Sequence, residues 1–154
     1  FRSPLNDSVL KELRANRKID IEWTRYNAAD RAHVNADQLL GAAMHIVESL
    51  RNDRVVLVHC KSGQGRSATA LALARVFLVI DELRKDQRYQ NASTRDRKHA
   101  VDYITKREIA AIASSRPESS ISPAKAVELY QLGYAYSGVI DSDIQSAPGV
   151  PVNQ

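Results

Sequence analysis

The sequence predicts an α/β fold with a small, mostly parallel central sheet flanked by helices. Val55–Val58 is a short, unbroken apolar run rich in β-branched residues, which is typical of a strand buried on both faces. Ser67–Ile80 is apolar on nearly every side of a helix, so this helix is expected to be central and buried. Side chains alternate in character over Ile19–Tyr26, which predicts a further strand. One side of that strand is expected to carry Asp20, Glu22, Thr24 and Tyr26.

Two helices are predicted around the strand at Ile19–Tyr26. Leu5–Asn16 has a narrow apolar stripe, which favours a helix. Asn27–Asn35 is polar and is expected to be a loop. Ala36–Leu50 has a broad apolar face and predicts the second helix, for which Asn35 is a suitable N-cap.

The second half of the chain is predicted to be mainly helical. The buried helix is expected to run over about Arg66–Leu83. Arg84–Ala100 is polar and basic, and it is expected to form an exposed insertion between helices. A further helix is predicted over Val101–Ser114.

A strong start signal marks the last predicted helix. After a turn at Arg116–Ser122, Ser122 can act as N-cap and Pro123 suits the first helical position. This helix is expected to end near Tyr136. We therefore expect one domain over residues 1–140, followed by a loose tail over residues 141–154 that lacks apolar periodicity.

Composition and charge limit the classes of function. A chain of 154 residues fits one domain of ordinary size. The net charge of +4 favours anionic partners but is too small to indicate nucleic acid, so no nucleic-acid partner is expected. Cys60 is the single cysteine, and no intramolecular disulfide can form. This favours a reducing compartment, and the cytoplasm is the expected location.

Neither a transmembrane segment nor a signal peptide is expected. The longest apolar run, Ala68–Ile80, is interrupted by Arg75 and is too short to cross a bilayer. Phe1–Lys18 carries scattered charges and no apolar core of a signal peptide. Because the chain starts with Phe1, we expect a fragment, and address signals can lie upstream. The basic segment 84–98 is a candidate for peripheral contact with a membrane, a phosphoinositide or another partner.

The stretch between the predicted buried strand and the buried helix carries the chemistry. Backbone N–H groups at such a junction can turn inward and form an anion-binding nest, reinforced by the helix N-terminus. Glycines permit the backbone conformations that a nest requires. The residues expected to form this phosphate cradle are Lys61, Ser62, Gly63, Gln64, Gly65 and Arg66.

Cys60 is the candidate nucleophile of this loop. A helix N-terminus and nearby cations lower the pKa of a thiol, so Cys60 can attack phosphorus as a thiolate. Arg66 can grip two phosphate oxygens with its planar guanidinium. The Ser67 hydroxyl can donate a hydrogen bond to the thiolate, and His59 is expected to support the loop through the backbone. Lys61 adds positive charge, which suggests a highly anionic substrate.

The run His59–Ser67, in which five residues separate Cys60 from Arg66, resembles the signature of the protein tyrosine phosphatase superfamily. The short chain and the Ser-Ala-Thr after Arg66 look most like its dual-specificity branch. The run is also similar to the mitochondrial lipid phosphatase of that branch. The resemblance implies the cysteine-phosphatase fold and a phosphocysteine intermediate, with no metal and no cofactor. Family members carry two or more strands before the general-acid loop, so a missing N-terminal strand is expected upstream of Phe1.

The resemblance also implies a general-acid aspartate on a mobile loop before the cysteine. Asp30 matches that position best, and by geometry it could protonate the leaving oxygen and later activate water. Asp37 is the second candidate, although it lies inside the helix predicted from Ala36. The family loop often reads Trp-Pro-Asp, whereas this chain has Ala28-Ala29-Asp30.

Three functions fit these observations. The first is a cysteine-dependent phosphatase that hydrolyses phosphomonoesters on phosphotyrosine and phosphothreonine proteins. The second is a phosphatase acting on a phosphoinositide or another phospholipid. The third is a catalytically weak phosphate-binding module, which the altered segment at Ala28-Ala29-Asp30 motivates.

Overall fold

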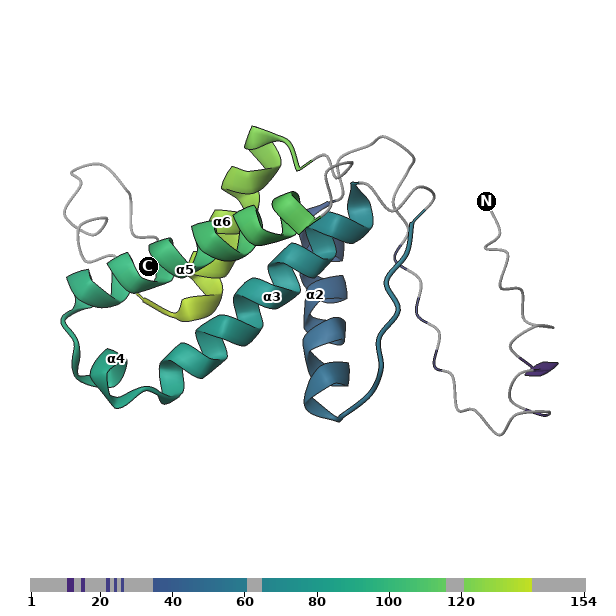
Figure 1. The fold of residues 1–154 in the computed structure, drawn as a ribbon, viewed down its shortest axis with the longest axis horizontal. Helices are drawn as coiled ribbons and strands as arrows, with labels where there is room; N and C mark the ends of the chain where they lie inside the picture. The colour runs from purple at the N-terminus through teal and green to yellow at the C-terminus, as the bar shows by residue number, and fades with distance from the viewer. Residues whose placement is uncertain are drawn as a thin grey trace, which may run out of the picture.

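The computed structural model of this chain describes residues 11, 12, 15, 22, 24, 26, 35–60, 65–115 and 121–139. Lys11, Glu12 and Ala15 are helical, as predicted for Leu5–Asn16, whose other residues lie outside the described part. The helices that follow are α2 (Ala36–Arg51), α3 (Arg66–Lys85), α4 (Gln87–Asn91), α5 (Thr94–Ser115) and α6 (Pro123–Ser137), as labelled in Figure 1.

The long helix α3 lies at the centre and contacts each of α2, α4, α5 and α6 (Figure 1). Its buried side chains come from all sides of the helix, which confirms the prediction of a central, buried helix over about Arg66–Leu83. Phe77 is fully buried and stacks on the ring of Tyr136 from α6, with 4.0 Å between the ring centroids. The largest fully buried side chains are Phe77, Leu39, Leu73, Ile80, Leu129, Val47, Val76, Val101 and Thr105.

Two helix starts follow the predicted capping residues. The Asn35 side chain accepts a hydrogen bond from the backbone N–H of Asp37, and α2 begins at the next residue after Asn35. The Ser122 hydroxyl accepts from the N–H of Lys125, and Pro123 occupies the first position of α6. Both predictions are therefore confirmed. At its other end, α6 stops at Gly138, whose φ of +70° is the left-handed conformation that favours glycine.

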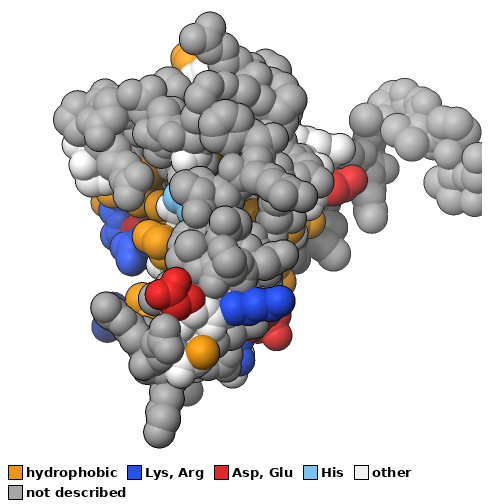
Figure 2. All heavy atoms as spheres, turned by 90° about the vertical axis from the view of Figure 1, so that its right-hand side faces the viewer, with side chains coloured by type: hydrophobic (Ala, Val, Ile, Leu, Met, Phe, Trp, Pro, Cys, Tyr) orange, Lys and Arg blue, Asp and Glu red, His pale blue; other side chains and the backbone are white. Residues whose placement is uncertain are grey.

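The prediction of an α/β fold with a central sheet is wrong for the described residues, because they contain helices and no strand. Residues 54–60, predicted to hold a strand buried on both faces, have no regular secondary structure. Val55 is 100% exposed and Leu57 is 81% exposed, whereas Val56 and Val58 pack against the core. The core is closed by packing of helices on α3, so only one side of this run finds apolar partners. On the face shown in Figure 2, hydrophobic side chains likewise reach the surface between charged ones.

Three described residues of the predicted strand Ile19–Tyr26 contact α2 or the segment that follows it. Glu22 forms an ion pair with Arg54, and the Thr24 hydroxyl lies 3.5 Å from His45 Nε2. The Tyr26 hydroxyl donates a 3.0 Å hydrogen bond to the carbonyl of Gly41. The backbone of these three residues has no strand assignment, and the alternating residues between them lie outside the described part of the chain.

The basic segment Arg84–Ala100 is mostly helical rather than an irregular insertion. The Asp86 side chain accepts from the N–H of Arg88 and caps the short helix α4. The Ser93 hydroxyl accepts from the N–H of Asp96 at the start of α5, which extends the helix predicted over Val101–Ser114 by seven residues, from 101 back to 94. Local capping by short polar side chains accounts for both helices.

The turn after α2 brings the chain back to the start of α3. Asp53 has a φ of +54°, and its N–H donates to the carbonyl of Leu50. From there residues 54–60 run back along α2, as the blue-teal trace in Figure 1 shows. Cys60 ends this segment and precedes Arg66, the first residue of α3, by six residues. None of the helices in the described ranges is long and apolar enough to cross a membrane.

Replacing Gly133 with valine is expected to destabilise the fold. A Cβ atom at this position of α6 would lie 2.7 Å from Val76 Cγ1 and 3.4 Å from Thr105 Oγ1. Because both neighbours are fully buried, the added methyl groups force α6 away from α3 and α5. We expect a loss of about 1–3 kcal/mol in the free energy of unfolding, measured by urea denaturation. Ala135→Val, at an exposed position of the same helix, is the control, and an equal loss in both variants would contradict the packing argument.

Removal of the Tyr130 hydroxyl is expected to change stability in a pH-dependent way. The hydrogen bond from Tyr130, followed by that from Lys106, lowers the pKa of Asp102 from its ordinary value of 3.8. The ionised carboxylate thus stabilises the folded state, fully so above pH 3.8, and the effect is lost as the pH falls below that value. Tyr130→Phe should lower the free energy of unfolding by about 0.5–1.5 kcal/mol at neutral pH.

Denaturation curves at a series of acidic pH values check this expectation. The difference between wild type and Tyr130→Phe should shrink as Asp102 becomes protonated. Tyr103→Phe is the control, because Tyr103 lies on α5 and is 66% exposed. A difference that stays constant down to the acid limit would show that Asp102 is not the partner.

Candidate active site

Cys60 and Arg66 lie at the two ends of the predicted phosphate cradle. Cys60 is a free cysteine with a partly buried side chain, at the end of the irregular segment 54–60. Arg66 is the first residue of α3 and is also partly buried. The residues between them that were predicted to cradle phosphate, Lys61, Ser62, Gly63 and Gln64, lie outside the described part of the chain. Arg66 thus lies at the N-terminus of a long helix, and Cys60 precedes it in the sequence by six residues.

The first turn of α3 favours an anion. Gly65 is its N-cap, and glycine has no side chain that could cap the helix. No acidic residue lies in the first turn, whereas α2 and α5 carry Asp37 and Asp96 there. A helix of 20 residues places a partial positive charge at its N-terminus, together with N–H groups that lack partners inside the helix. This end of α3 is therefore suited to hold a phosphoryl group.

The Ser67 side chain adds a donor at the same place. Ser67 is 2% exposed, and its hydroxyl is buried with no hydrogen-bond partner among the described residues. A buried hydroxyl without a partner costs free energy, so this group is open to donate to a water molecule, a ligand or a reacting group. Its position one residue after Arg66 agrees with the predicted role of donating to the Cys60 thiolate.

A contact that the sequence analysis did not single out fixes the start of α3. The Thr69 hydroxyl and the Thr69 N–H both donate to the carbonyl of Gly65, at 2.8 Å and 2.9 Å. This pair of bonds holds Gly65, a residue of the predicted cradle, against the first turn of the helix. The signal was present in the sequence, because threonine often bonds to the carbonyl four residues earlier in a helix.

The remaining predicted residues divide between described and undescribed parts. His59 is exposed, beside Cys60. Asp30, the predicted general acid, lies outside the described residues. Asp37, the second candidate, lies exposed in the first turn of α2. Among the described residues, no group of three His, Cys, Asp or Glu side chains is arranged to hold a metal ion.

A comparison with protein families decides the affiliation. Residues 1–122 match the family described as "Swiss Army Knife protein, DSP-PTPase phosphatase domain", or PTP-SAK. The chain belongs to this family. The PTP-SAK domain is a phosphatase of the cysteine-dependent type, and the predicted membership of the dual-specificity branch is confirmed. The further similarity to the mitochondrial lipid phosphatase stays a prediction.

The PTP-SAK match includes the whole stretch from Cys60 to Ser67, and it ends at Ser122, the N-cap of α6. Helix α6 nevertheless packs on α3 and α5, and its Leu129 is fully buried. No curated protein matches the chain, and no solved structure does.

Proposed function

We propose that this PTP-SAK domain is a dual-specificity protein phosphatase that releases phosphate from phosphotyrosine and phosphothreonine side chains. The observation that carries the proposal is the family match over the Cys60–Ser67 stretch, supported by Arg66 as the first residue of α3 and by the Ser67 hydroxyl, which has no partner among the described residues. The partial exposure of Cys60 supports the choice of substrates, since a nucleophile near the surface can meet a short phosphothreonine as well as a long phosphotyrosine.

In the first step, the Cys60 thiolate attacks phosphorus. A sulfur–phosphorus bond forms, and the bond from phosphorus to the substrate oxygen breaks with its electron pair going to that oxygen. The general acid, assigned here to Asp30, gives its proton to the leaving oxygen. The Arg66 guanidinium and the N–H groups of the loop and helix bind the oxygens of the transferring group, where negative charge is concentrated.

In the second step, water cleaves the phosphocysteine. The Asp30 carboxylate takes a proton from the water, whose oxygen attacks phosphorus, and the sulfur leaves as thiolate. The Ser67 hydroxyl donates to the departing sulfur and stabilises its negative charge. Inorganic phosphate then leaves, and the cysteine and the general acid have both returned to their starting states.

A phospholipid or phosphoinositide is the second candidate substrate. Lys61 in the cradle favours a substrate with more than one anionic group. Such a substrate would share the same two steps, so the difference lies only in what the phosphate is attached to.

Phosphate release from a panel of substrates tests the proposal. The panel consists of a generic aryl phosphate, phosphotyrosine and phosphothreonine peptides, and phosphoinositides, with wild type and Cys60→Ser assayed side by side. Release from both peptides by wild type only is the expected result. Preference for phosphoinositides would transfer the assignment to a lipid phosphatase. No release by a folded wild-type protein would favour the remaining alternative, a phosphate-binding module without efficient catalysis.

The variant Asp30→Ala tests whether the protein is an efficient phosphatase with Asp30 as its general acid. If Asp30 is the general acid, its removal should slow release by about 10²–10⁴-fold. The same loss should be much smaller for an aryl phosphate with an acidic leaving group, because that oxygen leaves without a proton. Asp37→Ala is the matched control, and a larger effect there would move the general acid to Asp37.

A further inference from the structure

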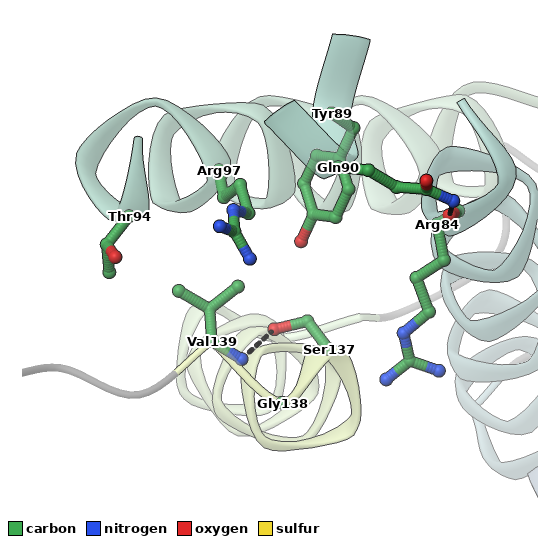
Figure 3. A pocket seen from close by; sticks show the side chains of 8 residues that line it. All are labelled: Arg84, Tyr89, Gln90, Thr94, Arg97, Ser137, Gly138 and Val139. Atoms are coloured by element: carbon green, nitrogen blue, oxygen red, sulfur yellow. Dashed lines mark hydrogen bonds between the residues drawn. The ribbon is translucent and has the colours of Figure 1, made fainter. Parts of the chain in front are cut away.

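A cavity lies at the other end of α3 from Cys60. Its volume is about 460 Å³, and it opens between the end of α3, the α4–α5 region and the end of α6 (Figure 3). Arg84 at the end of α3 is 18 residues from Arg66, which corresponds to about 27 Å along a helix. The cavity is therefore separate from the candidate active site. The residues that line the cavity include Arg84, Tyr89, Thr94, Arg97, Ser137 and Gly138.

Arg97 supplies an uncompensated positive charge to this cavity. Its Nε donates a 3.0 Å hydrogen bond to the carbonyl of Ala92, which fixes the guanidinium. The two terminal nitrogens point toward the space between α5 and α6 (Figure 3). Among the described residues, no carboxylate lies within ion-pair distance of Arg97. A fixed guanidinium with open N–H groups is well suited to bind two oxygens of one anion.

Arg84 forms the second positive wall. It donates to the carbonyl of Tyr136 at the end of α6, and it lies over the Tyr136 ring at 4.9 Å from the centroid. Its partner Asp81, 3.4 Å away, is shared with Arg51, so this cluster of three charges keeps a net positive charge. No carboxylate is among the described residues that line the cavity. The carboxylate of Asp96, near the start of α5, accepts a hydrogen bond from Ser93.

Tyr89 supplies a buried donor without a partner. The residue is 9% exposed, and its hydroxyl has no hydrogen-bond partner among the described residues. Figure 3 shows this hydroxyl directed into the space between Arg97 and Val139. Burial raises the pKa of Tyr89, more than the nearby arginines lower it, so the phenol stays protonated and can donate. An acceptor oxygen in the cavity would satisfy this group.

We propose that this cavity, the Arg97 cavity, binds the phosphate group of a small phosphorylated ligand at a site distinct from the catalytic cysteine. The terminal nitrogens of Arg97 and the Tyr89 hydroxyl supply the donors, and the Arg84 cluster adds positive charge beside them. A phosphate monoester suits this set, because it accepts several hydrogen bonds and carries up to two charges. A volume of about 460 Å³ exceeds that of phosphate alone and falls within the range of small-molecule sites. The phosphate is therefore attached to an organic group of sugar or polyol size.

The cavity also depends on a part of the chain outside the family match. Ser137, Gly138 and Val139 form one wall, and they follow residue 122, where the match ends. A Cβ atom added at Gly138 would lie 3.9 Å from Arg84 Nη2, and Arg84 donates to the Tyr136 carbonyl, so the end of α6 lies against the arginine. The site is thus built from α6 as well as from the PTP-SAK segment, and it does not require Cys60 to react.

Calorimetric titration with inositol trisphosphate tests the proposal. The full chain carries Cys60→Ser and Arg66→Ala, so that the probe is not hydrolysed and the cradle contributes little to binding. Arg97→Gln in this background should weaken binding by about tenfold to a hundredfold, the effect of losing a charge-assisted contact. Arg95→Gln is the matched control, because Arg95 is an exposed arginine of α5 that does not line the cavity, and its effect should be below about threefold.

A second variant keeps the test valid if Arg97→Gln unfolds. Thr94→Glu puts a carboxylate at the first position of α5, where an acidic residue stabilises a helix, and at the rim of the cavity. It should also weaken binding by about tenfold or more. Absence of binding in the Cys60→Ser, Arg66→Ala protein, or equal binding by Thr94→Glu and Arg95→Gln, would overturn the proposal.

Vesicles distinguish the two sources of such a phosphate. Sedimentation with phosphatidylcholine vesicles that contain phosphatidylinositol monophosphate, reduced by Thr94→Glu, would identify a lipid headgroup. Binding of inositol trisphosphate without sedimentation would identify a soluble ligand. Either result supports the Arg97 cavity, and neither depends on phosphatase activity, which the substrate panel measures separately.

Discussion

Replacing Cys60 with serine is expected to abolish phosphate release without unfolding the protein. The chain has one cysteine, so the variant contains no alternative thiolate. A serine hydroxyl remains protonated near neutral pH and is a far weaker nucleophile than a thiolate, so the rate should fall by about 10⁴-fold or more. The assay is phosphate release from an aryl phosphate, with far-UV circular dichroism to follow the helices.

A binding measurement distinguishes loss of the nucleophile from loss of the phosphate-binding site. The Cys60→Ser protein should still bind a phosphotyrosine peptide, because Arg66 and the N-terminus of α3 are unchanged. Release within about tenfold of wild type would exclude Cys60 as the nucleophile, since one charge-assisted contact alone accounts for a change of that size.

Replacing Arg66 with lysine is expected to reduce the rate strongly although the charge is kept. Lysine carries a point charge on a flexible stem, whereas arginine presents a planar fork that matches two phosphate oxygens. Loss of the second, oriented contact should lower kcat/KM for the aryl phosphate by about 10²–10³-fold. Most of the loss should appear in kcat, because the two oriented contacts of the guanidinium stabilise the transferring phosphoryl group most strongly in the transition state.

Arg75→Lys is the matched control for this variant. Arg75 lies on the same helix and donates two hydrogen bonds to the buried carboxylate of Glu108, at 3.0 Å and 3.2 Å. Its replacement should lower stability slightly and leave kcat/KM within about twofold, because the pair lies away from the site. An equal loss of activity in both variants would mean that stability of α3, and not phosphate binding, explains the effect of Arg66→Lys.

Several helices could be predicted because their signals are local. Asn35 and Ser122 cap α2 and α6 through side chains that bond to N–H groups two and three residues later. The apolar character of α3 on all sides predicted its central place. Helix α4 and the start of α5 were missed, although Asp86 and Ser93 form the same kind of cap, because the polar composition of this segment was interpreted as an exposed insertion.

The sheet could not be judged from the sequence, because burial of a short apolar run depends on what packs against it. Val55 and Leu57 have the composition of a buried strand, yet they lie exposed, while Val56 and Val58 face the helices. An apolar run of four residues fits more than one structure. The start of α3 at Arg66 was predicted from the sequence, whereas the common site of Cys60, Arg66 and Ser67 stays a prediction. The Arg97 cavity was not predictable, since it joins Arg84, Arg97 and Gly138 across three helices.

The packing of α6 has a practical consequence for anyone who expresses this domain. A fragment cut at residue 122, where the family match ends, would lack Leu129 and Tyr136. The surfaces of Phe77 and Val76 that α6 covers would then be open to water. Exposed apolar grooves of this kind promote self-association and proteolysis. Soluble, protease-resistant protein therefore requires a chain that continues through Val139, even though the catalytic signature ends far earlier.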